Sequence, residues 1–225
     1  MKIAGLVKNS FVDYPGHIAA VIFTNGCNLN CFYCHNEKLI HGDMECNLTE
    51  NDIIEFLKER FGFLEGVVIT GGEPTLQKDL IDFISKIKSL GYKVKLDTNG
   101  TNYEVVKKLI EKQLVDYIAM DYKAPIQKYF DIVGKCNVNE IIKTKQLLLN
   151  EKVDYEFRTT FCSGLNEDDI EQIALEIRNA KAFYIQHCNK KDGKDFGSIP
   201  NKLMAQKGCE KAKKFVKLSN LRGFD

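Results

Sequence analysis

Short apolar segments and amphipathic segments alternate along most of this 225-residue chain, and this alternation restricts its fold more than any other feature. The apolar segments are rich in β-branched residues, as buried strands are, and the segments between them have apolar residues at helical spacing. The strands predicted from this pattern are 17–24, 66–70, 92–97, 115–121, 153–161 and 183–187. The predicted helices are 49–61, 78–90, 103–113, 138–150 and 167–180, followed by a helix at 201–218 outside the sheet.

Strands that are joined by crossover helices run parallel, so the pattern predicts an α/β fold. Two architectures satisfy it, an open doubly wound sheet and part of a (β/α) barrel. No G-x-G-x-x-G follows the first strand, which argues against a dinucleotide-binding sheet. Polar motifs follow the ends of successive strands, where the active sites of parallel α/β folds lie. These motifs are the cysteine-rich segment 27–34, GGEP at 71–74, DTNG at 97–100 and DYK at 121–123.

Charge and hydropathy exclude several classes of function. The chain has 32 basic and 31 acidic side chains, so its net charge of +1 gives no basic surface typical of nucleic-acid binding. Its longest apolar run, 18–23, is far shorter than the ~20 residues that span a bilayer. The first residues, MKIAGLVKNS, have no apolar core of a signal peptide. We therefore expect a cytoplasmic protein with neither membrane nor nucleic-acid partners.

Three of the eight cysteines lie within eight residues, as Cys27, Cys31 and Cys34. A structural zinc site needs four ligands, and no second cysteine pair or suitable histidine pair follows. A dithiol redox site needs only the last two of the three. Three thiolates in one loop instead hold three corners of a [4Fe–4S] cluster and leave the fourth iron open, which is the reading we favour. We expect the remaining cysteines to be small buried residues; these are Cys46, Cys136, Cys162, Cys188 and Cys209.

The C-x3-C-x2-C spacing, with Tyr33 before the third cysteine and GGEP after the next strand, resembles the radical S-adenosylmethionine superfamily. The resemblance implies a partial (β/α)6 barrel of parallel strands with a short C-terminal helical extension. We expect a single domain over 1–225, in which the resemblance covers a core at about 5–187 and leaves the tail at 193–225 unassigned. The implied cofactors are a [4Fe–4S] cluster and S-adenosyl-L-methionine.

Finer features resemble the glycyl-radical-enzyme activating enzymes. They are CHN at 34–36, DTNG and DYK. The opening FVDYPG at 11–16, followed by VIFTNGC at 21–27, looks like the activating protein of anaerobic ribonucleoside-triphosphate reductase. The resemblance implies reductive cleavage of S-adenosylmethionine to a 5′-deoxyadenosyl radical, which makes a glycyl radical in a loop of a partner enzyme. The implied electron donor is a flavodoxin or ferredoxin. Alternatives are an activase of pyruvate formate-lyase, a 7-carboxy-7-deazaguanine synthase, and a non-enzymatic zinc- or cluster-binding module.

The same resemblance implies a role for each motif residue. Cys27, Cys31 and Cys34 are the cluster ligands and act in catalysis through the cluster. The implied cofactor-binding residues are Cys34 with Tyr33, His35, Gly71, Gly72, Glu73, Asp97, Thr98, Asp121, Tyr122, Lys123, Arg158 and His187. Structural alternatives stay open for several of them: a tight turn at Gly71 and Gly72, a helix cap at Asp97, and a core histidine at His187.

Overall fold

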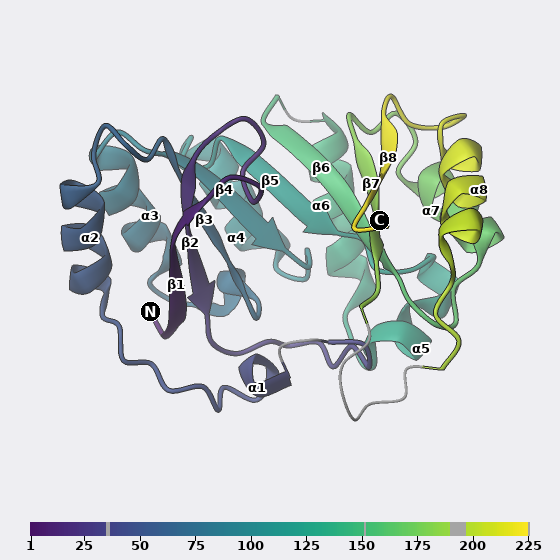
Figure 1. Cartoon of the computed structure of the whole chain (residues 1–225), viewed down its shortest axis with the longest axis horizontal. Helices are drawn as coiled ribbons and strands as arrows, with labels where there is room; N and C mark the ends of the chain where they lie inside the picture. Colours follow the sequence, from purple (N-terminus) through teal and green to yellow (C-terminus); the bar gives the residue numbers. More distant parts are fainter. Residues whose placement is uncertain (35–36, 151, 190–196, 225) are drawn as a thin grey trace.

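The computed structural model describes residues 1–34, 37–150, 152–189 and 197–224. These residues form an eight-stranded sheet with helices packed on its outer side (Figure 1). The strands are β1 (Ile3–Ser10), β2 (Ala19–Thr24), β3 (Gly66–Gly71), β4 (Lys93–Thr98), β5 (Tyr117–Asp121), β6 (Asp154–Phe161), β7 (Phe183–His187) and β8 (Ser219–Arg222).

Helices lie between most successive strands along the chain. They are α1 (Glu37–Ile40), α2 (Glu50–Glu59), α3 (Leu80–Ser89), α4 (Tyr103–Glu111), α5 (Tyr129–Val133), α6 (Val138–Asn150), α7 (Glu167–Glu176) and α8 (Lys202–Ala212), with 3-10 turns at Pro74–Leu76 and Ile126–Lys128. Thr49 begins α2 with a capping box, in which its side chain accepts from the backbone of Asp52 and the Asp52 carboxylate accepts from the backbone of Thr49. No helix in the described part of the chain is long and apolar enough to cross a membrane.

The order of strands in the sheet is the order in the sequence, from β1 to β8. Each strand from β2 to β8 runs parallel to its neighbour, and only β1 is antiparallel to β2 among the described pairs. A doubly wound sheet would reverse this order at its centre, so the arrangement decides between the two predicted architectures. The prediction of an α/β fold with a partial (β/α)6 barrel is confirmed, and the six predicted strands correspond to β2–β7.

The two outermost strands were not expected from the sequence. The first, β1, mixes apolar residues with exposed polar ones; it pairs along β2 and has a single further bridge, between Ile3 and Leu48. The last, β8, is four residues long with the sequence SNLR, which has little of the apolar character that marks a strand. The predicted helix at 201–218 is shorter than expected, because α8 ends at Ala212. The proposed division into a core and a tail stays a prediction.

Side chains alternate between the two faces of the sheet and give each face a different chemistry. The face toward the helices is fully buried and apolar, with Leu96 on β4 and Phe157 on β6 among its residues. The opposite, inner face bears charged residues on the same strands, such as Asp97 and Arg158. Because successive side chains of a strand point to opposite faces, one sequence supplies both the core and a polar cavity.

Candidate functional site

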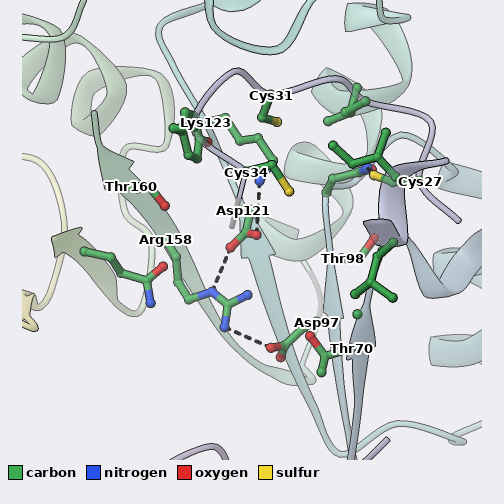
Figure 2. Close-up of a pocket in the computed structure, with 18 of the residues that line it drawn as sticks. Cys27, Cys31, Cys34, Thr70, Asp97, Thr98, Asp121, Lys123, Arg158 and Thr160 are labelled. Carbon is green, nitrogen blue, oxygen red and sulfur yellow. Dashed lines mark hydrogen bonds and ion pairs between the residues drawn. The ribbon is translucent and has the colours of Figure 1, made fainter. Parts of the chain in front are cut away.

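A cavity of about 330 Å³ opens at the carboxyl ends of the parallel strands (Figure 2). These ends lie along the lower edge of the sheet in Figure 1. The cavity brings together the four polar motifs that the sequence analysis singled out, each from a different strand end. It is lined by Cys27, Leu29, Cys31, Tyr33, Cys34, Leu39, Ile40, Thr70, Gly71, Gly72, Asp97, Thr98, Asn99, Asp121, Lys123, Arg158, Thr160, Gln186, His187 and Asn189.

The loop after β2 presents the three clustered cysteines to one end of this cavity (Figure 2). Backbone hydrogen bonds hold the loop: Cys27 N–H donates to the carbonyl of Ile40 at 3.2 Å, and Asn30 N–H donates to that of Val133 at 3.0 Å. All three thiols are free and partly buried. Burial raises the pKa of Cys27 to about 11 and also raises that of Cys31. Binding a metal as thiolates would therefore release protons.

The three cysteines do not form a site for a single metal ion. Among the described residues, no group of three or more His, Cys, Asp or Glu side chains is arranged to hold one ion. In an iron–sulfur cluster each cysteine instead binds a different iron, so the sulfurs need not meet at one point.

Gly71 and Gly72 are required by a close approach of two backbones. A Cβ at Gly71, whose φ is +115°, would lie 2.4 Å from the nitrogen of Thr24. A Cβ at Gly72 would lie 2.1 Å from the carbonyl oxygen of Gly26, directly before Cys27. Gly72 N–H donates to the Thr24 carbonyl at 2.9 Å. The two glycines therefore bring the end of β3 against the start of the cysteine loop, and both also line the cavity.

Glu73 is fully buried and lies behind the cavity wall instead of lining it. Its Oε1 accepts hydrogen bonds from Thr75 N–H at 3.1 Å and from the hydroxyls of Thr75 and Thr98 at 2.5 and 2.8 Å. Its Oε2 accepts from the backbone N–H of Asn99 at 2.7 Å. Asn99 in turn donates from its side-chain amide to Asn28 at 3.0 Å, within the cysteine loop. Glu73 thus connects the GGEP, DTNG and cysteine segments.

A row of alternating charges crosses the inner face of the sheet at the cavity. Arg158 is central: its Nε donates to Asp121 at 2.8 Å and its Nη1 donates to Asp97 at 3.0 Å. Lys95 donates to Asp97 at 2.5 Å, and Lys123 donates to Asp121 at 3.2 Å. Figure 2 shows Arg158 between the two carboxylates. Within the described residues, Arg158 Nη2 donates to no protein atom.

These pairings move the pKa values of the partners in opposite directions. Burial opposes the charged form of Asp121, but Arg158 and Lys123 outweigh it and lower the pKa of Asp121 to about 2. Burial likewise opposes the charge of Arg158, yet Asp121 and Asp97 raise its pKa. The pKa of Lys123 is raised in the same way, mainly by Asp121. Asp121, Lys123 and Arg158 therefore stay ionised at neutral pH.

Tyr33 supplies an unusual polar atom to the cavity. The residue is 5% exposed, and within the described part of the chain its hydroxyl meets no partner at hydrogen-bond geometry, although it lies close enough to the Cys31 thiol to oppose the rise of that thiol's pKa. The Nζ of Lys123 lies 6.0 Å from the centre of the ring. A buried hydroxyl without a partner is costly, which is consistent with a position that a ligand completes.

Other predicted residues lie in different surroundings. Tyr122 is fully buried on the helix side of the sheet, where its hydroxyl donates to Glu176 at 2.7 Å, and its side chain does not line the cavity. His187 lines the cavity, bonds Asn189 at 2.8 Å and packs edge-on against Phe224. His35 lies outside the described residues.

Several lining residues were not selected from the sequence. Thr70 and Thr160 are on strands whose motif residues were found, and both line the cavity. The alternation of side chains could have identified Thr160, which is two residues beyond Arg158. Asn99 is inside the DTNG motif, whereas Asn189 follows the last predicted strand and had no signal.

The donor set suits the cofactors that the sequence resemblance implies. Three thiols from one loop are available for three irons, and the adjoining cavity offers backbone at Gly71 and Gly72, carboxylates and cationic groups. A zwitterionic ligand with an aromatic base matches such a lining, in which the Tyr33 hydroxyl lacks a partner in the described structure.

Comparison with known proteins agrees with this geometry. Residues 21–177 match the family model described as the radical SAM superfamily. A Methanocaldococcus jannaschii protein provisionally named a glycyl-radical enzyme activating enzyme is 40% identical over 88% of this chain and 85% of its own length. The pyruvate formate-lyase-activating enzyme of Streptococcus mutans is 29% identical, with coverages of 82% and 77%.

Two further matches are more limited, one in the length that it covers and the other in its sequence identity. A Pyrococcus horikoshii protein provisionally named GTP 3′,8-cyclase is 28% identical over 67% of this chain and 48% of its own length. The crystal structure of a radical SAM methyltransferase from Sphaerobacter thermophilus superposes with a TM-score of 0.75. It covers 95% of this chain and 68% of the methyltransferase at 15% identity, so this likeness concerns the fold alone.

Proposed function

The chain belongs to the radical SAM superfamily, and from this premise we propose that it is an activating enzyme that makes a glycyl radical on a partner enzyme. The observation that carries the proposal is the likeness to the Methanocaldococcus jannaschii relative, which extends over most of both chains. The superfamily uses a [4Fe–4S] cluster and S-adenosylmethionine, and its members are enzymes that generate radicals. The residues of the cavity are compatible with both cofactors.

The extent of each likeness favours an activase over a small-substrate enzyme. The two activating-enzyme relatives are matched over 85% and 77% of their length, but the relative named a GTP cyclase over only 48%. About half of that cyclase therefore has no counterpart in this match. Zinc- or cluster-binding without catalysis would leave the charged cavity beside the cysteines without a use.

The cavity residues divide into three proposed tasks. Cys27, Cys31 and Cys34 would hold the cluster, which together with S-adenosylmethionine supplies a 5′-deoxyadenosyl radical when both are bound. The backbone carbonyls at Gly71 and Gly72 would accept hydrogen bonds from the amino group of the cofactor, because the Gly72 N–H already donates to Thr24. Tyr33, with its unpartnered hydroxyl, would lie beside the adenine, and we propose His35 and His187 as further neighbours.

Charge in the cavity would orient the amino-acid part of the cofactor. Arg158 keeps Nη2 for the cofactor carboxylate because Asp97 and Asp121 already accept from Nε and Nη1. Lys123 supplies a second cation nearby. Asp97 and Thr98 would bind a cation next to that carboxylate. Glu73 would act by holding the wall and not by touching the cofactor.

For the partner we propose anaerobic ribonucleoside-triphosphate reductase, on the FVDYPG segment and the motif set described above. A glycine in a partner loop suits hydrogen abstraction because no Cβ obstructs the approach to its Cα. Flavodoxin or ferredoxin is the proposed electron donor, and the proposed location is the cytoplasm. Pyruvate formate-lyase is the alternative partner, supported by the Streptococcus mutans relative.

Electron paramagnetic resonance tests the proposed chemistry and the proposed partner separately. After anaerobic reconstitution with iron and sulfide and reduction, we expect a [4Fe–4S]+ signal that changes when S-adenosylmethionine is added, and 5′-deoxyadenosine as product. Tightly bound zinc with no such signal would refute the proposal that the protein is a radical enzyme. Each purified candidate partner is then added in turn, and we expect a glycyl-radical signal with the reductase. A signal only with pyruvate formate-lyase would change the partner and keep the chemistry.

A further inference from the structure

The last strand of the sheet contributes Arg222, whose side chain is 35% exposed, to an ion pair with the buried carboxylate of Glu156. Arg222 on β8 donates from Nη1 and Nη2 to the two oxygens of Glu156 on β6, at 2.6 and 2.8 Å. Glu156 is completely buried, and its Oε2 also accepts from the hydroxyl of Tyr117 at 2.8 Å. The Arg222 guanidinium lies 3.4 Å from the centre of the Tyr184 ring on β7. These contacts fix its orientation.

Glu156 lies on the same inner face as Arg158, two residues earlier on β6. Arg158 is therefore the nearest cavity cation along that strand. The carboxylate of Glu156 is now occupied by Arg222 and Tyr117, while Arg158 bonds Asp97 and Asp121. Without Arg222, a buried unpaired carboxylate would attract the guanidinium of Arg158, because a buried charge without a partner is strongly unfavourable.

We propose that Arg222 is a positioning residue for the cofactor site: by neutralising Glu156 it keeps Arg158 on Asp97 and Asp121, with Nη2 directed to the ligand. The C-terminal strand is then part of the active-site machinery although Arg222 does not line the cavity. This inference rests on the proposed function, since it takes S-adenosylmethionine as the ligand that Arg158 meets.

The dissociation constant of S-adenosylmethionine, measured by equilibrium binding to the reconstituted protein, tests the proposal without relying on turnover. Arg222→Met should weaken binding about tenfold, as expected for the loss of one charge-assisted contact. The double variant Glu156→Gln/Arg222→Met should bind within about twofold of the wild type, because no free carboxylate then competes for Arg158. Arg222→Lys should also bind nearly as the wild type, since it keeps the charge.

A matched control removes a charge close by in the sequence: Lys217→Met, at an exposed lysine just before β8, should leave binding unchanged. If the double variant is as weak as Arg222→Met, or if Arg222→Met binds as the wild type, the proposal is wrong. If Arg222→Met fails to fold, the double variant and Arg222→Lys decide, and weak binding by either overturns it. If the wild type itself does not bind S-adenosylmethionine, it is the proposed function that fails.

Discussion

Replacing Glu73 by alanine should destabilise the metal-free protein severely, because this carboxylate supports three segments from inside the wall. Two of its hydrogen bonds come from backbone N–H groups, those of Thr75 and Asn99, and both residues are almost completely buried. Leaving a buried donor unsatisfied costs about 1–3 kcal/mol, so the two N–H groups alone cost roughly 2–6 kcal/mol. That is a large part of the ~5–15 kcal/mol by which a domain is stable.

Glutamine at the same position separates the effects of shape and of hydrogen bonding. Its amide oxygen can replace Oε1, which accepts three bonds, but its NH2 group then faces the N–H of Asn99, where Oε2 accepted. We expect a loss of about 1–3 kcal/mol for Glu73→Gln, between the wild type and Glu73→Ala.

Urea unfolding of the reduced, metal-free protein measures these values without dependence on the cofactors. Glu59→Ala is the control: Glu59 is exposed at the end of α2, and its loss should change stability by no more than ~0.5 kcal/mol. If Glu73→Ala stays within 1 kcal/mol of the wild type, roughly the lower limit for one unsatisfied donor, the reasoning about the wall is refuted.

The pH dependence of the unfolding free energy, compared between the wild type and Glu73→Gln, gives a second check. Burial raises the pKa of Glu73, and its hydrogen bonds only partly oppose this. A carboxyl whose pKa is higher in the folded state binds its proton more tightly there, so its contribution to stability is fully present below the unfolded pKa and falls as pH rises through the folded value. The stability advantage of the wild type over Glu73→Gln should therefore shrink as pH rises. An advantage that grows with pH would contradict the assignment.

Three further changes have expected outcomes. Cys34→Ala should abolish iron–sulfur loading, measured as bound iron and sulfide, whereas the exposed Cys46→Ala should load normally; an intact cluster in the first would refute the ligand assignment. Gly72→Ala should prevent normal folding, measured by circular dichroism and urea unfolding, because its Cβ would overlap backbone at 2.1 Å; wild-type stability would contradict the close approach. Arg158→Met should cost about 1.5–3 kcal/mol in urea unfolding, since Asp97 and Asp121 each lose a charge-assisted hydrogen bond but keep Lys95 and Lys123 as partners. In the wild type, the low pKa of Asp121, about 2, gives stability that is present above its usual value of 3.8 and lost as pH falls toward 2. Arg158→Met should begin acid unfolding at a higher pH, and an unchanged midpoint would refute this pairing.

The sequence predicted the parallel strands because each is a compact apolar run between amphipathic helices. It missed β1 and β8, since an edge strand has a neighbour on one side only and needs less apolar sequence. It predicted that the motifs at the strand ends meet, which follows from parallel topology alone. The position of Glu73 behind the wall could not be predicted, because it depends on the turn at Pro74–Leu76 and on the approach of Asn99 from the next strand.

Charged residues inside β6 indicate that the barrel has a polar interior. The pairing of the strands determines which residues these charges meet there. The segment Asp154–Phe161 alternates acidic, basic and hydroxyl residues with aromatic ones, so one face of this strand must contact a polar interior and not an apolar core. That much is readable from residues 154–161. The partners are not: Arg158 meets Asp97 from 61 residues away, and Glu156 meets Arg222 from 66 residues away. The register of the strands from β4 to β8 selects these pairs, since β4 lies beyond β5 on one side of β6 and β8 lies beyond β7 on the other. The short, weakly patterned strand β8 thus carries the one basic group that bonds Glu156 among the described residues, and our proposal for Arg222 depends on this pairing.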